Sequence, residues 1–305
     1  MATPAQWIEG MRPRTLPLSI SPVIAGSSVA LAAGGFHLGR AVLALVVGVA
    51  MQIGVNLSND YSDGVRGTDA YRVGPQRLVG SGAATPGAVK RAAFAAYGVG
   101  CLAGLGLVII THLWWLIALG VAIVAAAWFY TGGRHPYGYA GLGEVFVFLF
   151  FGVAAVAGTV LVLTLFRPVD VTLARHIGAT IAATFAQGLG ACAVLVANNL
   201  RDIPTDAKAG KKTLSVRLGD HNSRLLFFGL VAGSVVAAAA TACLTARWGL
   251  LCLVMIVWLF PAVALVARGK TGLRLVRALK LVGLGQLAGS IGLLAGVFLA
   301  TVTGA

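Results

Sequence analysis

The chain has 305 residues, of which 58% are hydrophobic and only 10% are charged, and its mean hydropathy is +0.90. So few charges cannot cover the surface of a soluble domain of this length, and the composition therefore indicates a multispanning membrane protein. The net charge of +14 is not accompanied by any nucleic-acid-binding motif, which excludes nucleic acid as the expected partner. We attribute the charge to basic loops on one side of the membrane and to the binding of an anion.

Long apolar runs recur along the chain without the alternation that is typical of barrel strands, which predicts membrane-spanning helices. The expected spans are roughly residues 16–33, 41–57, 88–110, 113–131, 142–164, 176–198, 223–244, 249–267 and 280–302. We expect an all-α integral membrane protein, with nine transmembrane helices in one bundle and a central cavity open to the cytoplasmic side.

The basic residues orient these spans. If the N-terminus is cytoplasmic, the outer side keeps four of the 23 Lys+Arg residues: Arg40, Arg167, Arg175 and Arg247. This bias is a strong positive-inside signal. We therefore expect the N-terminus and the loops after the second, fourth and sixth spans to face the cytoplasm.

A polar segment follows the second expected span. Asn56, Asn59, Asp60 and Asp63 are three or four residues apart and fall on one helix face, and Asp69 comes shortly after. The chain has only 9 Asp+Glu residues, so this concentration indicates a functional site at a membrane helix end. A solvated helix cap is the alternative interpretation, because Asn and Asp also end helices.

A second copy favours the site. Asn198, Asp202 and Asp206 follow the sixth expected span, and the spacing from Asn198 to Asp202 repeats that from Asn59 to Asp63. The repeat suggests a duplication inside one domain.

We expect residues 1–305 to form a single polytopic domain. Its two motif-bearing halves are about 16–131 and 142–267, and the last helix, 280–302, lies outside them.

Two facing groups of carboxylates suit Mg²⁺, which prefers oxygen ligands and usually bridges carboxylates to phosphates. Basic residues surround both groups, which indicates an anion such as diphosphate between them. In an apolar bundle, a diphosphate suggests a lipid tail among the helices. Ionisation of such a substrate would leave an allylic cation, which electron-rich rings such as Tyr130, Tyr137 and Tyr139 could stabilise.

At these motifs the sequence resembles the UbiA superfamily of membrane prenyltransferases, and within it the menaquinone-branch dihydroxynaphthoate polyprenyltransferases. The resemblance spans almost the whole chain. It is carried by Asn56-x-x-Asn59-Asp60-Tyr-x-Asp63, by Arg72-Val-Gly74-Pro75-x-Arg77, by Tyr130-Thr-x-Gly-x-x-Pro136-Tyr137-Gly138-Tyr139 and by Asn198-Asn199-x-Arg201-Asp202-x-x-x-Asp206.

The resemblance implies a Mg²⁺-dependent enzyme in the bacterial plasma membrane. The enzyme would transfer a prenyl group from polyprenyl diphosphate to 1,4-dihydroxy-2-naphthoate with loss of CO₂, giving demethylmenaquinone. The implied metal-site residues are Asn56, Asn59, Asp60, Asp63, Asn198, Asp202 and Asp206. The implied diphosphate-binding residues are Arg72, Arg77, Arg134, Lys208, Lys211 and Lys212. The implied catalytic residues are Asp63, Asp69, Tyr130 and Tyr139.

One departure from the superfamily pattern concerns the third acid of the first motif. Many members carry it four residues after the second acid, where this chain has Gly67, and Asp69 lies six residues after Asp63. Asp69 could therefore serve either the metal or the acceptor.

Two alternatives come from other classes of protein. Asp60-x-x-Asp63-Gly64 imitates the start of a CDP-alcohol phosphotransferase signature, but the residues that follow do not continue it. A transporter could use the acids as an ion pathway, although they lie at helix ends and not at mid-span. Within the family, other aromatic acceptors remain open.

Overall fold

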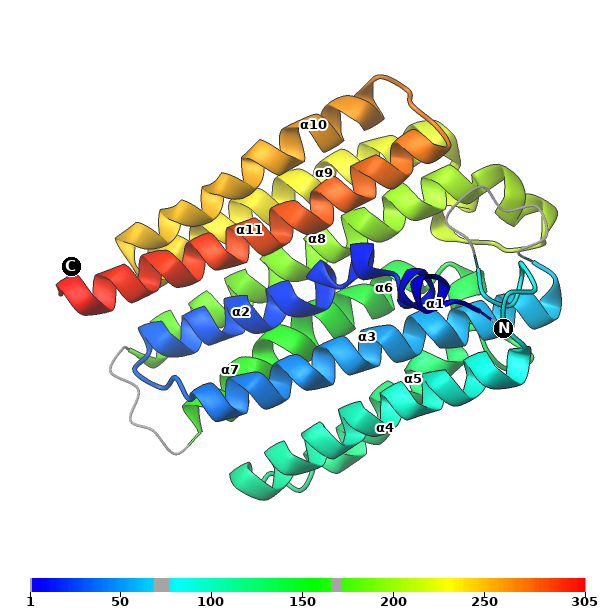
Figure 1. Ribbon diagram of the computed structural model, residues 1–305. Helices are drawn as coiled ribbons and strands as arrows, with labels where there is room; N and C mark the ends of the chain where they lie inside the picture. Colours follow the sequence, from blue (N-terminus) through cyan, green and yellow to red (C-terminus); the bar gives the residue numbers. More distant parts are fainter. Residues whose placement is uncertain (1, 69–76, 166–171, 305) are drawn as a thin grey trace.

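The computed structural model describes residues 2–68, 77–165 and 172–304, and within these residues every regular element is helical. Figure 1 shows the helices lying side by side, with the two chain ends at opposite ends of the bundle. The first half of the chain forms α1 (Pro4–Met11), η1 (Pro13–Thr15), α2 (Pro17–Ala32), α3 (Leu38–Arg66), α4 (Pro86–Thr111) and α5 (Leu116–Phe129). The second half forms η2 (Tyr137–Ala140), α6 (Gly143–Val147), η3 (Phe148–Ala157), α7 (Gly158–Thr164), α8 (Leu173–Lys208), α9 (Leu214–Thr245), η4 (Arg247–Val254), α10 (Met255–Ala267) and α11 (Leu273–Thr303).

The expected apolar runs are all helical, which confirms an all-α membrane bundle. Within the described ranges, seven helical segments are long and apolar enough to cross a membrane, and α1–η1 with α2 would make an eighth span bent by 47°. The remaining run, α5, is shorter, at 14 residues. At about 1.5 Å per residue it reaches about 21 Å, less than a hydrocarbon core of about 30 Å. The count of nine spans therefore stays a prediction.

Two helices continue well beyond the spans that were expected for them. The expected second span ends at residue 57, but α3 runs on to Arg66, and α8 continues past residue 198 to Lys208. A span predicted from hydropathy ends where polar residues begin. The backbone stays helical beyond that point because tertiary contacts stabilise the extension. Both acidic motifs are therefore on helices, as their spacing required.

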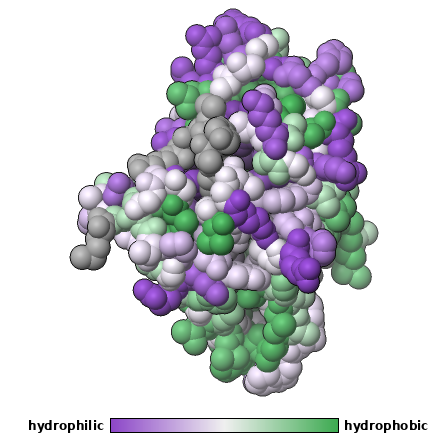
Figure 2. All heavy atoms as spheres, turned by 90° about the vertical axis from the view of Figure 1, so that its right-hand side faces the viewer, coloured by the Kyte–Doolittle hydropathy of each residue, from purple (hydrophilic) through white to green (hydrophobic). Residues whose placement is uncertain are grey.

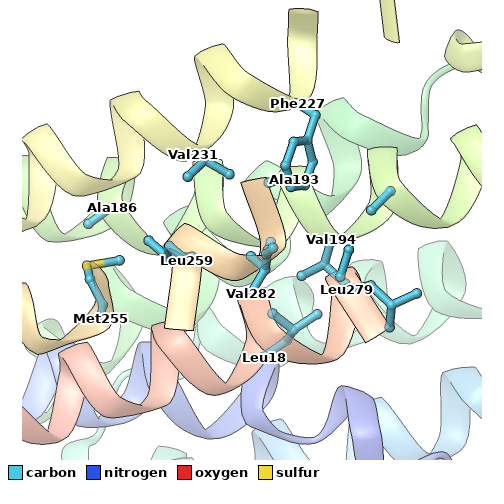
Figure 3. Packing of buried hydrophobic residues seen from close by; sticks show 14 of the residues in the cluster. Leu18, Ala186, Ala193, Val194, Phe227, Val231, Met255, Leu259, Leu279 and Val282 are labelled. Carbon is cyan, nitrogen blue, oxygen red and sulfur yellow. The ribbon is translucent and has the colours of Figure 1, made fainter. Parts of the chain in front are cut away.

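Helix α8 lies at the centre of the bundle, beside α2, α9 and α11 (Figure 1). In its most apolar window 67% of the residues are buried, against 33% for α3 and for α9. Figure 3 shows Ala186, Ala193 and Val194 of α8 packed among Phe227 and Leu279 of the neighbouring helices. Small residues such as these alanines let helices approach closely in a membrane.

A row of glycines on α11 brings that helix against η4 and α10. A Cβ on Gly292 would lie 2.4 Å from the carbonyl oxygen of Leu251, and one on Gly296 would lie 2.0 Å from that of Trp248. The two backbones are therefore in direct contact, as in other small-residue helix interfaces.

We expect Gly296→Ala to lower the free energy of unfolding by about 1–3 kcal/mol, because the added methyl group overpacks a backbone contact that cannot move aside cheaply. Gly229→Ala in α9 is the matched control, since its Cβ meets no atom within 4 Å. Thermal unfolding of both variants in detergent measures the effect, and equal melting temperatures would contradict the packing of α11 described here.

Candidate active site

Asp60, near the end of α3, holds a turn later in the chain by two hydrogen bonds. Asp60 accepts hydrogen bonds from the backbone N–H groups of Leu78 at 2.8 Å and Val79 at 2.9 Å. These two bonds fix the turn that carries Arg77, whose guanidinium lies 3.4 Å from Asp63, one turn further along α3. Asp60 thus positions a cation beside Asp63, and both of its oxygens are engaged in doing so.

Asp63 is contacted by side chains from three other parts of the chain. Besides Arg77, its carboxylate accepts a hydrogen bond of 2.5 Å from the Tyr139 hydroxyl and lies 3.5 Å from the Lys211 ammonium. The residue is 3% exposed. These partners compensate the carboxylate for the water that it loses on burial.

Lys211 connects the two acidic motifs. Its ammonium lies 3.5 Å from Asp63 of α3 and 3.9 Å from Asp206 of α8, and it sits 4.5 Å from the centre of the Tyr139 ring. The backbone holds it there, because the N–H of Lys212 donates to the carbonyl of Tyr139 at 2.9 Å. The structure therefore brings the first motif, the 137–140 turn and the second motif together at one point.

The other predicted metal-site residues have local partners. Asn59 accepts a hydrogen bond from the Thr131 hydroxyl at 2.7 Å. Asn56 donates to the carbonyl of Met11 at 2.9 Å and so ties α3 to the N-terminal segment. Of the amides, Asn59 therefore faces the loop that carries the tyrosines, whereas Asn56 lies on the side of α1.

On α8, Arg201 holds the polar side chains of the second motif. Its guanidinium donates two hydrogen bonds to Asp202, at 2.6 and 2.5 Å, and a third to Asn198 at 2.9 Å. The Arg201 side chain is buried. A pair of adjacent residues could not be inferred from helix periodicity, because residues i and i+1 do not normally face each other.

The predicted tyrosines lie in an aromatic row beside the acids. Tyr130 packs edge-on against Tyr137 with ring centroids 5.4 Å apart, and Tyr137 lies 4.1 Å from Phe146. Burial raises the pKa of Tyr130, and nearby acids, first Glu144 and then Asp63 and Asp206, raise it further. The pKa of Tyr139 is raised by burial and by its Asp63 partner. Both phenols therefore stay protonated at neutral pH.

Further cations surround this end of the bundle. Arg66 donates to the carbonyl oxygens of Thr131 and Gly133, which secures the turn before the tyrosines. Arg134, Lys208 and Lys212 are exposed. Figure 2, which looks onto this end, shows hydrophilic residues gathered on it and hydrophobic residues along its lower edge.

Two predicted site residues, Asp69 and Arg72, lie outside the described residues. Sequence reasoning also missed contributors that the structure reveals. Thr131 holds Asn59, and Asn199 donates a hydrogen bond to Glu144. The family-like motif around Tyr130 contained Thr131, but nothing in the spacing showed that its hydroxyl would face α3.

The donor set was tested for its fit to Mg²⁺. Within the described ranges, no three Asp, Glu, His or Cys side chains gather into a ready-made metal site. Instead, two carboxylates from different helices share the ammonium group of Lys211, which lies at the position between them that a metal ion could take. Mg²⁺ is commonly bound by one or two carboxylates together with substrate phosphates, so Asp63 and Asp206, with Asn59 nearby, fit this ion.

A model of the UbiA prenyltransferase family matches residues 19–284. The chain belongs to this family. The 1,4-dihydroxy-2-naphthoate octaprenyltransferase of Mycobacterium tuberculosis is 48% identical to it over 287 residues, which cover 94% of each protein. The chain is therefore a prenyltransferase of the UbiA family and a multi-pass membrane protein.

Solved structures of UbiA homologues share the fold. The apo structure of a homologue from Aeropyrum pernix K1 aligns with a TM-score of 0.69 and 16% identity, covering 93% of this chain and 98% of that protein. A homologue from Archaeoglobus fulgidus, bound to GPP and Mg²⁺, aligns with a TM-score of 0.62 and 15% identity, covering 95% and 99%. These likenesses confirm the helical architecture of this UbiA-family enzyme.

We expect Lys211→Gln to lower the stability of the metal-free enzyme by about 1–3 kcal/mol, because two carboxylates lose the cation they share. Addition of Mg²⁺ should then raise the melting temperature of the variant more than that of the wild type. Lys208→Gln, which changes an exposed lysine at the end of α8, is the control for both measurements. If both lysine variants respond alike to Mg²⁺, Lys211 does not occupy the cation position.

Proposed function

We propose that this UbiA-family enzyme transfers a polyprenyl group from polyprenyl diphosphate to 1,4-dihydroxy-2-naphthoate, with loss of CO₂, and so forms demethylmenaquinol, the reduced form that a separate two-electron oxidation converts to demethylmenaquinone. The observation that carries the proposal is the joining of the two acidic motifs through Lys211 beside protonated tyrosines. The acceptor is inferred from the relative in Mycobacterium tuberculosis, whose name specifies this naphthoate. The enzyme would act in the bacterial cell membrane, with this end of the bundle and a cavity between the motifs facing the cytoplasm.

The motif residues would bind the diphosphate and the metal. Asp63, Asp202 and Asp206 would hold Mg²⁺, aided by Asn59. Arg77 and Lys211 already lie among these acids, where they can contact phosphate oxygens once the substrate is present. When bound, Mg²⁺ neutralises the charge that grows on the departing diphosphate. A UbiA homologue bound to GPP and Mg²⁺ supports this assignment.

The reaction balances with these two substrates alone. The bond between C1 of the prenyl chain and the diphosphate oxygen breaks, and diphosphate leaves with the electron pair. The ring carbon that bears the acceptor carboxylate forms the new bond to C1. The carboxylate then leaves as CO₂, and the electrons of the broken bond restore the aromatic ring.

The aromatic rings of Tyr130, Tyr137 and Phe146 would shield the allylic cation from water. Tyr130 stays neutral because burial raises its pKa, so its ring offers electron density without trapping the cation as an ether. Tyr137 and Phe146 pack beside it and exclude water from this wall of the site.

We expect purified protein in detergent, given Mg²⁺ and polyprenyl diphosphate, to convert dihydroxynaphthoate to a prenylated product with release of diphosphate and CO₂. Mass analysis of products from a panel of aromatic acceptors measures specificity, and removal of Mg²⁺ by a chelator should stop turnover reversibly. Prenylation of another acceptor without reaction of dihydroxynaphthoate would overturn the acceptor assignment. An absence of any product, under conditions in which a relative is active, would overturn the proposal itself.

We expect Asp63→Asn and Asp202→Asn each to lower kcat by a factor on the order of 100 or more, because each removes a charge from the metal and diphosphate site. Asp220→Asn is the control, since Asp220 is exposed and pairs with Arg224 near the start of α9. Turnover is measured on samples whose melting temperatures match the wild type. Near-normal activity in either site variant would remove that residue from the site.

A further inference from the structure

Glu144, at the start of α6, has an unsatisfied carboxylate oxygen. Its Oε1 accepts a hydrogen bond of 3.1 Å from the amide of Asn199 on α8. Its Oε2 is buried and receives no hydrogen bond anywhere in the described chain. A buried acceptor without a donor is destabilising, so the position is understandable if a ligand supplies the missing donor.

Glu144 lies beside the proposed reaction site. The hydroxyl of Tyr130 lies 3.2 Å from the place that a Cβ on Gly143, the preceding residue, would take. Burial raises the pKa of Tyr130, and the nearby acids Glu144, Asp63 and Asp206 raise it further. Tyr130 is thus a neighbour of Glu144, and it precedes the turn whose Tyr139 donates to Asp63.

The surroundings of Glu144 differ from those of the motif acids. Asp63 and Asp202 each contact a cation, whereas no Lys, Arg or His among residues 2–68, 77–165 and 172–304 forms an ion pair with Glu144. A diphosphate would find no cation of the described chain to bind there. The missing partner is therefore a neutral hydrogen-bond donor, and the nearby rings of Tyr137 and Phe146 suit a flat aromatic molecule.

We propose that Glu144, held by Asn199, binds the aromatic acceptor by accepting a hydrogen bond from one of its hydroxyl groups at Oε2. This assignment rests on the proposed function, because dihydroxynaphthoate supplies the hydroxyl. Because no cation of the described chain pairs with Glu144, the carboxylate of the acceptor would be turned away from it, towards the cations of the motifs.

This arrangement makes Glu144 a determinant of acceptor specificity. Because Oε2 has no partner in the described chain, it favours a ligand with a hydroxyl at the right place and disfavours an analogue without one. The pair 1-hydroxy-2-naphthoate and 4-hydroxy-2-naphthoate tests this, since each lacks one of the two hydroxyl groups.

We expect the wild type to bind dihydroxynaphthoate at least about tenfold more tightly than one of the two analogues, measured as inhibition constants. Glu144→Gln should weaken the binding of dihydroxynaphthoate by about 10-fold and remove that preference, since the hydrogen bond at Oε2 is lost. The KM for polyprenyl diphosphate should stay within about twofold. Glutamine can still accept the bond from Asn199, so the melting temperature should change little.

Three controls separate the outcomes. Asp220→Asn should leave both constants unchanged, and Asn199→Ala should shift acceptor binding in the same direction as Glu144→Gln, which provides the test if the glutamine variant does not fold. If the wild type prenylates dihydroxynaphthoate but the variants keep its preference, or raise both KM values equally, the role of Glu144 is refuted and the proposed function stands. A wild type inactive towards dihydroxynaphthoate would refute the proposed function instead.

Discussion

The contact on which the rest of the site depends is the ammonium of Lys211 between Asp63 and Asp206. Two carboxylates on separate helices would repel each other at a buried helix end, and one shared cation converts that repulsion into attraction. The same contact holds α3, α8 and the Tyr139 turn together. Lys211 lies where the proposed metal and diphosphate would bind, so this cation would give way to ligands that bring their own charges.

The packing of the apolar helices supports this charged end of the bundle. Small residues on α8 and glycines on α11 let helices pack closely, and 67% of the most apolar window of α8 is buried. Helix α8 carries Asp202 and Asp206, and the turn held by Asp60 places Arg77 beside Asp63. The packing of the apolar bundle therefore sets the positions of the site residues.

Sequence reasoning predicted the parts of this arrangement that depend on periodicity and composition. The apolar runs gave the helices, and the spacing of Asn59 and Asp63 placed both on one face of α3. It could not predict that Asp60 would bind the amides of Leu78 and Val79, because that contact depends on how a distant turn folds back. The partner of Asp202 was equally hidden, since an adjacent arginine is not a helix-face neighbour.

Glu144 and the motif acids lie in different electrostatic surroundings. Cations contact the acids of the two motifs, which suits a metal and an anion, whereas Glu144 has an amide as its hydrogen-bond partner and no ion pair among the described residues. Burial raises the pKa of Tyr130, and Glu144, Asp63 and Asp206 raise it further, so the phenol stays protonated. In the proposed arrangement, an aromatic hydroxyl would bind at Glu144 and a diphosphate at the motifs, so the acceptor ring and C1 of the prenyl chain would meet beside the Tyr130 ring.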